Sequence, residues 1–382
     1  MRRLLAALAA LSLLGLGGCT SGRGVYANYR AVEDMLLVKT LGVDAGPGGL
    51  ILSAASARPR DGAPTILRGE ASAIAPGLEA LQAHTPRGQL YFAHTQYIVL
   101  GRDYAAGGVD ALLDYVERDV RTRMGAAIFV MRSGDAAALL TGSGEDWDVS
   151  DVLAAARQEA AQCGAGVSDV RETAVALSEY GAALVCALRA VETEGSVFGL
   201  SPGRAAVPDG CGILKDGALV GFLSQREAEA AALLRGDLGA VTRTLDYAGG
   251  RVTLEVRCGA PEMSFSSVGE GGILLRVRAA PTAAITGTDV PGGVTDAAAL
   301  AAIAAAVDDA LRAELTQIIA REKAEGCDFL LLQRALRRQG LDPDALPEDW
   351  LETLKAAVTV ETVVRHSYDL QERVGTDGGG VP

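Results

Sequence analysis

The chain has 382 residues, and because a domain takes about 100–200 residues this length predicts roughly two or three domains with sizeable cores. Hydrophobic residues make up 49% and charged residues 22% of the chain, which is globular usage and excludes global disorder. Acidic residues outnumber basic ones by 48 to 35, for a formal net charge of −13, and no dense Lys/Arg run occurs. Nucleic-acid binding is therefore not expected, since it needs clustered basic side chains against phosphates.

The first residues indicate the compartment. The sequence opens MRRLLAALAALSLLGLGGCT, in which two arginines precede an apolar stretch shorter than the about 20 residues that a membrane-spanning helix needs. A basic start before a short apolar run is typical of a secretory signal peptide. The motif LGGC at residues 16–19 resembles the bacterial lipobox, whose cysteine sulfur accepts a diacylglyceryl group. We therefore expect a signal peptide over residues 1–18, a lipidated Cys19 that anchors the protein to the membrane, and a tether over residues 19–30.

Strand-like and helix-like patterns alternate over residues 31–195, which predicts an N-terminal α/β domain of one or two subdomains. Apolar runs flank a Gly/Pro turn near its start, and QLYFAHTQYIVL at residues 89–100 is rich in aromatic and β-branched side chains, as a single buried strand would be. Strands are expected over residues 35–43, 50–55, 89–100, 126–131 and 184–191. Helices are expected over residues 78–83, 109–123, 136–140, 149–162 and 171–180.

Five glycines and two prolines between residues 195 and 212 predict a linker over residues 196–212. A C-terminal α+β domain is expected over residues 213–372, beginning with a hairpin whose turn is Lys215-Asp216-Gly217. The sequence SQRE at residues 224–227 is a capping box that starts a helix. A continuous apolar stripe predicts a long helix over residues 296–325, a further strand is expected over residues 357–370, and residues 373–382 read as a flexible tail.

Beyond Cys19 the chain holds five widely spaced cysteines without a CxxC motif, namely Cys163, Cys186, Cys211, Cys258 and Cys327. Such spacing does not match zinc or iron–sulfur sites. An odd number leaves at least one thiol unpaired within the chain. We interpret the five as small buried side chains, and their spacing leaves the redox state of each one open.

Motifs for catalysis fail on physical grounds. The sequence GLSPG at residues 199–203 matches the G-x-S-x-G pattern of serine hydrolases, but Pro202 follows the serine and has no N–H for an oxyanion hole. A metalloprotease HExxH, a phosphate-binding loop and a dinucleotide fingerprint are all missing from the sequence. His94, within the expected strand, is interpreted as a core or edge residue. We therefore predict a protein that is not an enzyme and has no cofactor or metal.

Several short motifs follow one another in a fixed order behind the lipobox. RAVED at residues 30–34 precedes LGVD at residues 41–44, and LYFAH at residues 90–94 opens an aromatic strand. DYVERD at residues 114–119 ends a helix in an Arg-rich turn, and GFL at residues 221–223 follows a Lys-Asp turn. The motif residues considered as candidates for a functional role are Arg30, Glu33, Asp34, Gly42, Asp44, His94 and Arg118.

This order resembles the Ger(x)C family, the lipoprotein C subunits of bacterial spore germinant receptors. The resemblance implies a non-enzymatic receptor subunit on the outer face of the spore inner membrane. It also implies partnership with two polytopic membrane subunits, A-type and B-type, in a complex that responds to small nutrients. The motif residues would then be structural or lie at an interface, and direct nutrient binding by this subunit is not implied.

A solute-binding lipoprotein of a transporter is the alternative hypothesis. Such proteins have two similar α/β lobes around a cleft, whereas the two halves of this chain have different patterns. An anchored cell-wall hydrolase is a weaker third hypothesis, because the sequence offers no nucleophile, metal set or acid pair. The expected fold is accordingly a mixed α/β or α+β, multi-domain, lipid-anchored ectodomain.

Overall fold

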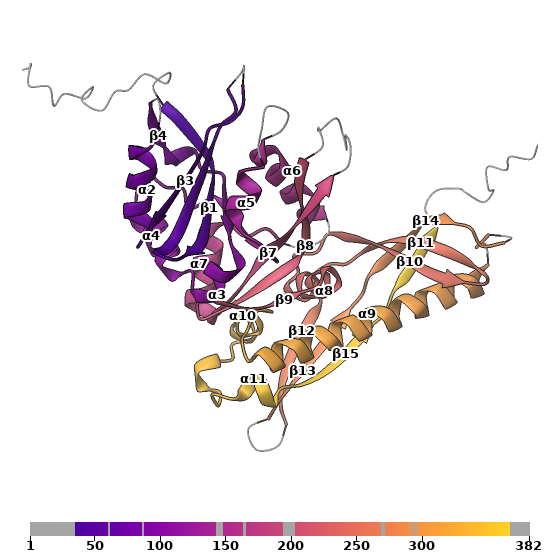
Figure 1. The fold of residues 1–382 in the computed structure, drawn as a ribbon. Helices are drawn as coiled ribbons and strands as arrows, with labels where there is room; N and C mark the ends of the chain where they lie inside the picture. The colour runs from indigo at the N-terminus through magenta and orange to yellow at the C-terminus, as the bar shows by residue number, and fades with distance from the viewer. Residues whose placement is uncertain are drawn as a thin grey trace, which may run out of the picture.

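A computed structural model describes residues 35–59, 62–85, 88–142, 148–162, 166–193, 203–268, 272–291, 293–294 and 296–366. These residues form a mixed α/β protein with three mixed sheets, of nine, four and three strands. The large sheet and its helices occupy one part of the molecule, and the two smaller sheets flank a single long helix in the other (Figure 1). Within the described residues, every helix is too short or too polar to span a bilayer.

The large sheet has the order β3-β2-β1-β5-β6-β7-β8-β9, with β4 paired to one end of β1. Strands β1, β5, β6 and β7 run parallel, and the remaining neighbours on this path are antiparallel. Every residue of β5 and β6 is buried, as expected for parallel strands covered on both faces. The bounds are β1 (Met35–Gly46), β2 (Gly49–Ser56), β3 (Ile66–Ala71), β4 (Gln89–Tyr91), β5 (Tyr97–Leu100), β6 (Ala127–Met131), β7 (Ala182–Thr193), β8 (Gly203–Lys215) and β9 (Ala218–Leu223).

Helices cover both faces of this sheet and create two separate cores. One core contains the apolar sides of α2 (Ile74–Ala83), α3 (Arg102–Gly107), α4 (Asp110–Arg118) and α7 (Val170–Tyr180). The other contains α5 (Ala136–Leu140), α6 (Val149–Gln162) and α8 (Gln225–Arg235), and it continues into the C-terminal part of the chain. The capping box predicted at Ser224 and Glu227 starts α8 and is confirmed.

The C-terminal part is built on α9 (Ala297–Glu325), which confirms the predicted long helix. Its apolar stripe is buried against two sheets, and its length lies along both of them (Figure 1). One sheet has the order β10-β11-β14-β16 and the other β12-β13-β15. The bounds are β10 (Ala240–Tyr247), β11 (Gly250–Arg257), β12 (Glu262–Val268), β13 (Gly272–Ala279), β14 (Thr282–Thr288), α10 (Leu332–Arg338), η3 (Pro343–Ala345), α11 (Trp350–Thr353), β15 (Lys355–Val360) and β16 (Val363–His366).

The single strand predicted over residues 89–100 is wrong. Both β4 and β5 pair with β1, but a short 3₁₀ helix, η2 (Phe92–His94), separates them. Between the pairs Leu37–Tyr91 and Thr40–Tyr97, β1 advances by three residues and its partner by six. The 3₁₀ turn takes up the extra residues, so His94 lies in a turn on the surface and not in a buried strand.

The linker predicted over residues 196–212 is also wrong where the structure describes it. Residues 203–212 belong to β8, which pairs with β7 along most of its length. The Asp216-Gly217 turn has positive φ at both residues and connects β8 to β9, as predicted for the hairpin. That hairpin, however, completes the nine-stranded sheet and does not open a separate sheet. The Gly and Pro residues of this segment lie in a strand that contains a bulge. A local pattern rich in Gly and Pro does not distinguish such a strand from a linker.

The last predicted strand, over residues 357–370, is divided in its described part. Residues 355–360 add β15 to the three-stranded sheet, and residues 363–366 add β16 to the four-stranded sheet. The Thr362 N–H between them donates to the Asp308 carboxylate on α9, at 2.7 Å. The long helix therefore helps to direct the chain from one sheet to the other.

Candidate functional site: a pocket between two motifs

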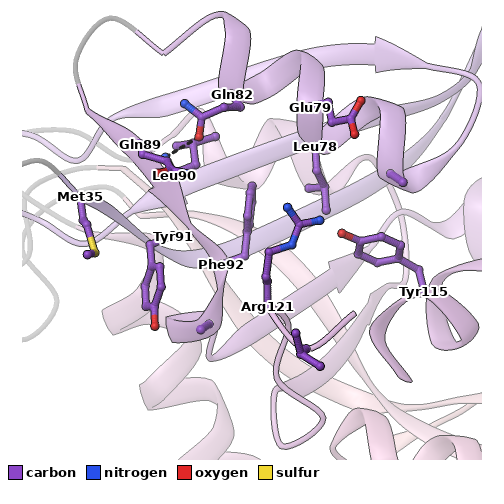
Figure 2. A pocket seen from close by; sticks show the side chains of 13 residues that line it. Met35, Leu78, Glu79, Gln82, Gln89, Leu90, Tyr91, Phe92, Tyr115 and Arg121 are labelled. Carbon is purple, nitrogen blue, oxygen red and sulfur yellow. Dashed lines mark hydrogen bonds between the residues drawn. The ribbon is translucent and has the colours of Figure 1, made fainter. Parts of the chain in front are cut away.

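A pocket of about 400 Å³ opens between α2, the β4–η2 segment and the loop that follows α4 (Figure 2). Its walls are mostly apolar and come from Met35, Leu78, Leu90, Phe92 and Val120 among others. Two large apolar side chains at its edge face solvent, since Val120 is 96% exposed and Tyr91 is 40% exposed. Exposed apolar groups around a concave surface are typical of a binding site.

The loop at the edge of the pocket is built around Asp119. The predicted helix over residues 109–123 ends at Arg118, and Asp119 is extended, so the next residues form a turn. The Asp119 carboxylate accepts bonds from Arg121 Nε (3.0 Å), Arg121 Nη2 (2.7 Å) and the Arg121 backbone N–H (2.9 Å). This local pairing places the Arg121 guanidinium in the pocket wall (Figure 2).

Tyr115 connects this loop to α4. Its hydroxyl donates to Asp119 Oδ2 at 2.5 Å. Burial, and then the bond to Asp119, raise the pKa of Tyr115 to about 12, so the phenol stays protonated and remains a donor at neutral pH. Hydrogen bonds from Arg121 hold the pKa of Asp119 well below its ordinary value, so this carboxylate stays ionised. The three groups bond to one another and form a polar side to an apolar pocket.

Two glutamines lie at the opposite side. The Gln82 side-chain carbonyl accepts the Leu90 N–H at 2.7 Å, which fastens β4 to α2. The Oε1 atom of Gln89 is buried and has no hydrogen-bond partner in the structure. A buried acceptor without a donor costs free energy, and a ligand or partner that supplies an N–H or O–H would offset that cost.

A second, more open pocket of about 560 Å³ adjoins the first and shares Ala75, Tyr115 and Val120 with it. Arg118 lies here, in an exposed ion pair with Asp114 at 2.7 Å. Burial raises the pKa of Tyr104 in the same wall to about 12, and its hydroxyl is buried without a partner. The two pockets form one extended depression over α2 and α4.

The depression brings together two of the motifs compared above. LYFAH at residues 90–94 supplies one wall, and DYVERD at residues 114–119 supplies the other. His94 itself is next to the first pocket, with its ring 5.6 Å from that of Tyr91. Sequence patterns alone identified both motifs but not their adjacency, because α4 contacts α2 only in the folded chain.

Gly42 and Asp44 line neither pocket, and both contact α5 from β1. The buried Asp44 carboxylate accepts the N–H groups of Ala136 (2.7 Å) and Ala137 (2.8 Å), the first residues of α5. A Cβ on Gly42 would lie 3.2 Å from that of Ala136, so a side chain at residue 42 would press against the helix. Both residues therefore contact the start of α5, where a carboxylate is favourable.

The other motif residues, Arg30, Glu33 and Asp34, lie outside the described residues, as do Cys19 and Cys163. The remaining cysteines, Cys186, Cys211, Cys258 and Cys327, are buried, and the structure has no disulfide among these four. Among the side chains that the structure describes, no group of His, Cys, Asp and Glu is arranged to hold a metal ion.

Two family models match the chain, and together they take in more than half of it. Residues 28–153 match the model described as "Spore germination protein N-terminal domain", and residues 209–368 match "Spore germination B3/ GerAC like, C-terminal". Both pockets fall within the first matched range. No curated protein matches the chain.

A solved structure has a similar fold. It is titled "Crystal Structure of the GerBC protein" and superposes with a TM-score of 0.55 at 16% sequence identity. The match covers 85% of this chain and 96% of that chain. At this level of identity the likeness concerns the fold alone.

Proposed function

Because the chain belongs to the GerAC-like family of spore germination proteins, we propose that it is the C subunit of a germinant receptor that supports receptor assembly and nutrient-triggered signalling. The observation that carries this proposal is the match of both family models, N-terminal then C-terminal, on a fold like that of GerBC. The protein is thus C-subunit-like, and the proposed role is non-enzymatic. The proposed partners are two polytopic membrane subunits, A-type and B-type.

The proposed location is the outer face of the spore inner membrane, with the diacylglyceryl group on Cys19 as the anchor. The motif at residues 16–19 supports this proposal. Removal of residues 1–18 takes away Arg2 and Arg3 and leaves a formal net charge of −15, which anionic head groups repel, so the proposed anchor is the lipid. Acyl chains on one residue contribute about 0.8 kcal/mol per buried CH₂, which suffices for stable attachment when several chains are present.

The depression over α2 and α4 is the proposed contact with a membrane subunit. Its support is the exposed apolar edge, with Val120 at 96% and Tyr91 at 40% exposure, around a concave apolar surface. Interfaces of this kind seat a few apolar or aromatic side chains of a partner in a pocket. The buried Gln89 Oε1 then gains a donor from that partner.

The alternative of a solute-binding lipoprotein requires two similar lobes around a cleft. The nine-stranded sheet with helices on both faces differs from the two small sheets around α9. The pockets described above are within one half of the chain and not between two lobes. The structure therefore favours the receptor subunit over the solute-binding protein.

The test is complementation in the spore-forming source organism after deletion of the gene. The wild-type chain should restore nutrient-triggered germination and co-purify with the two membrane subunits. Val120→Asp should accumulate normally and lose most of that co-purification, because a carboxylate at the pocket edge opposes apolar contact. Val175→Asp is the matched control, since Val175 is also exposed, at 47%, but lies on α7 outside the pocket.

Normal germination of the deletion strain with every nutrient would contradict the receptor role, provided that no paralogue is present. Equal co-purification of the Val120 and Val175 variants would contradict the proposed contact alone. Tight binding of a single nutrient by the isolated chain would favour the solute-binding alternative.

A further inference from the structure

Two cysteines lie face to face in the nine-stranded sheet. Cys186 of β7 and Cys211 of β8 are directly opposite each other in antiparallel register. Their side chains are 0% and 2% exposed and belong to the same core on one face of the sheet. Opposed residues in such a pair have Cα atoms about 4.5–5.5 Å apart, within the about 4.4–6.8 Å that a disulfide spans. We propose that Cys186 and Cys211 form a cross-strand disulfide when the chain folds in the presence of a small-molecule disulfide.

A bulge beside the cysteines determines which residues oppose each other. Asp209 and Gly210 of β8 together face the single residue Ala187 of β7, next to the Cys186–Cys211 pair. Gly210 has a φ of 76°, and a Cβ there would overlap the backbone where β9 ends. The bulge is therefore specified by glycine at this position, and it holds the two cysteines in register.

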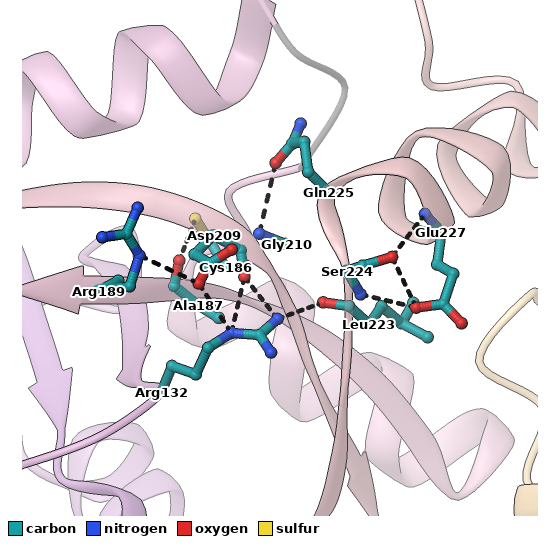
Figure 3. Close-up of polar contacts among 10 residues, drawn as sticks. All are labelled: Arg132, Cys186, Ala187, Arg189, Asp209, Gly210, Leu223, Ser224, Gln225 and Glu227. Carbon is teal, nitrogen blue, oxygen red and sulfur yellow. Dashed lines mark hydrogen bonds and ion pairs between the residues drawn. The ribbon is translucent and has the colours of Figure 1, made fainter.

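An arginine on the neighbouring strand end secures this bulge (Figure 3). Arg132 Nη2 donates to the backbone carbonyls of Asp209 (2.7 Å) and Leu223 (2.6 Å), and its guanidinium lies 4.9 Å from the Phe222 ring centre. Arg132 Nε and Arg189 Nε pair with Asp209 Oδ2 at 3.2 and 3.4 Å. A one-residue slip of β8 would break these contacts and turn Cys211 to the opposite face of the sheet.

The other described cysteines lack this arrangement. Cys258 follows β11 and Cys327 follows α9, and neither is opposed to a cysteine in any strand pair of the described residues. Both are nevertheless buried, at 8% and 6% exposure. Cys258 and Cys327 are matched controls, because they are buried like Cys186 and Cys211 but are not opposite another cysteine.

The bond forms most readily during folding, before β7 and β8 are covered. In the folded chain burial raises the pKa of Cys211 to about 12 and raises that of Cys186 further, so the reactive thiolates are scarce. The thiolate of Cys211 attacks one sulfur of oxidised glutathione and releases one glutathione thiolate. The thiolate of Cys186 then attacks the Cys211 sulfur of the mixed disulfide and releases the second. Two cysteine thiols are oxidised, one glutathione disulfide is reduced to two thiols, and the protons pass to those products.

The experiment uses the full chain in two samples. In one, the reduced and unfolded chain is refolded in detergent with oxidised and reduced glutathione. In the other, the chain is isolated from cells that export it. Both are denatured with N-ethylmaleimide present, digested, and mapped by mass spectrometry without reduction.

A linked peptide pair containing Cys186 and Cys211 in either sample, lost on reduction, supports the proposal. Cys258 and Cys327 should carry the maleimide in the same digests. Cys211→Ser should abolish the linked pair and expose Cys186 to the maleimide, whereas Cys258→Ser should leave the pair intact. Maleimide on both Cys186 and Cys211 in both samples, or a link from either one to a different cysteine, would overturn the proposal.

Discussion

The carboxylate of Asp44 lies directly against the backbone of Gly101, where β5 ends and α3 begins. A Cβ on residue 101 would overlap Asp44 Oδ1. That carboxylate receives two N–H groups from the start of α5, at 2.7 and 2.8 Å, so it cannot move without losing them. The backbone of Gly101, the carboxylate of Asp44 and the first turn of α5 thus depend on each other where β5 ends.

Gly101→Ala should lower the free energy of unfolding by about 1–3 kcal/mol, because the added methyl group displaces a buried, bonded carboxylate. Urea unfolding followed by circular dichroism measures the change. Gly107→Ala is the matched control, since a Cβ there meets nothing within 4 Å. Equal stability of the two variants would show that Asp44 yields without cost.

Arg243 is expected to be far more important for stability than Arg226, although both pair with Glu314. The Arg243 side chain is 9% exposed and contacts Glu229 at 2.6 Å and Glu314 at 3.2 Å. Arg243→Met leaves the buried Glu229 carboxylate without a cation and leaves Glu314 with only the exposed Arg226, so it should cost about 3–5 kcal/mol. Arg226→Met removes a pair whose arginine is 64% exposed and should cost about 0–1 kcal/mol. Chemical denaturation measures the free energy of unfolding of the two variants. A similar decrease in both would contradict the claim that burial makes the Arg243 pairs more important.

The carboxyl pair Glu322 and Asp328 should make stability fall as pH rises. Burial raises the pKa of Glu322 well above its ordinary value of 4.5, and Asp328 beside it raises it further. The folded chain therefore holds a proton that the unfolded chain releases above that ordinary value. The contribution of the protonated Glu322 to the free energy of unfolding is fully present below the ordinary pKa of 4.5. It is lost as pH rises through the higher pKa of the folded state.

Glu322→Gln should weaken this dependence, because an amide keeps the acceptor for the Leu330 N–H, at 3.2 Å, and leaves Asp328 as the one titrating member of the pair. Thermal unfolding from about pH 5 to about pH 9 provides the comparison. The thermal stability of the variant relative to that of the wild-type chain should increase as pH increases. The exposed Glu352→Gln serves as control, and parallel curves for all three chains would rule out the pair as the cause.

Lipidation at Cys19 remains a prediction from the motif at residues 16–19. Cells that produce the wild-type chain and take up a labelled fatty acid should yield a labelled protein. Cys19→Ala should lose the label completely, whereas Cys258→Ala should retain it, because Cys258 is buried at 8% exposure. Label on the Cys19 variant would place the acyl group elsewhere.

Features that depend on neighbours in sequence were predictable. The stripe of Ile303, Val307, Leu311 and Leu315 recurs at helical spacing, so it predicted α9 from residue order alone. The capping box at Ser224 and Glu227 and the turn at Asp216-Gly217 are also local, and the structure contains both. These features are stabilised by contacts between residues that are close in sequence, so the sequence pattern is enough to predict them.

Patterns along the chain were enough to predict the mixed α/β class, the long helix, the hairpin turn and the order of motifs that points to the family. Four features emerge only in the folded chain: β8 is a strand, residues 89–100 are interrupted at η2, two motifs border one pocket, and Cys186 opposes Cys211. Each of these depends on which strand lies beside which, over tens of residues. Pairing register and side-chain proximity arise from packing between distant segments, and local propensity contains no information about them.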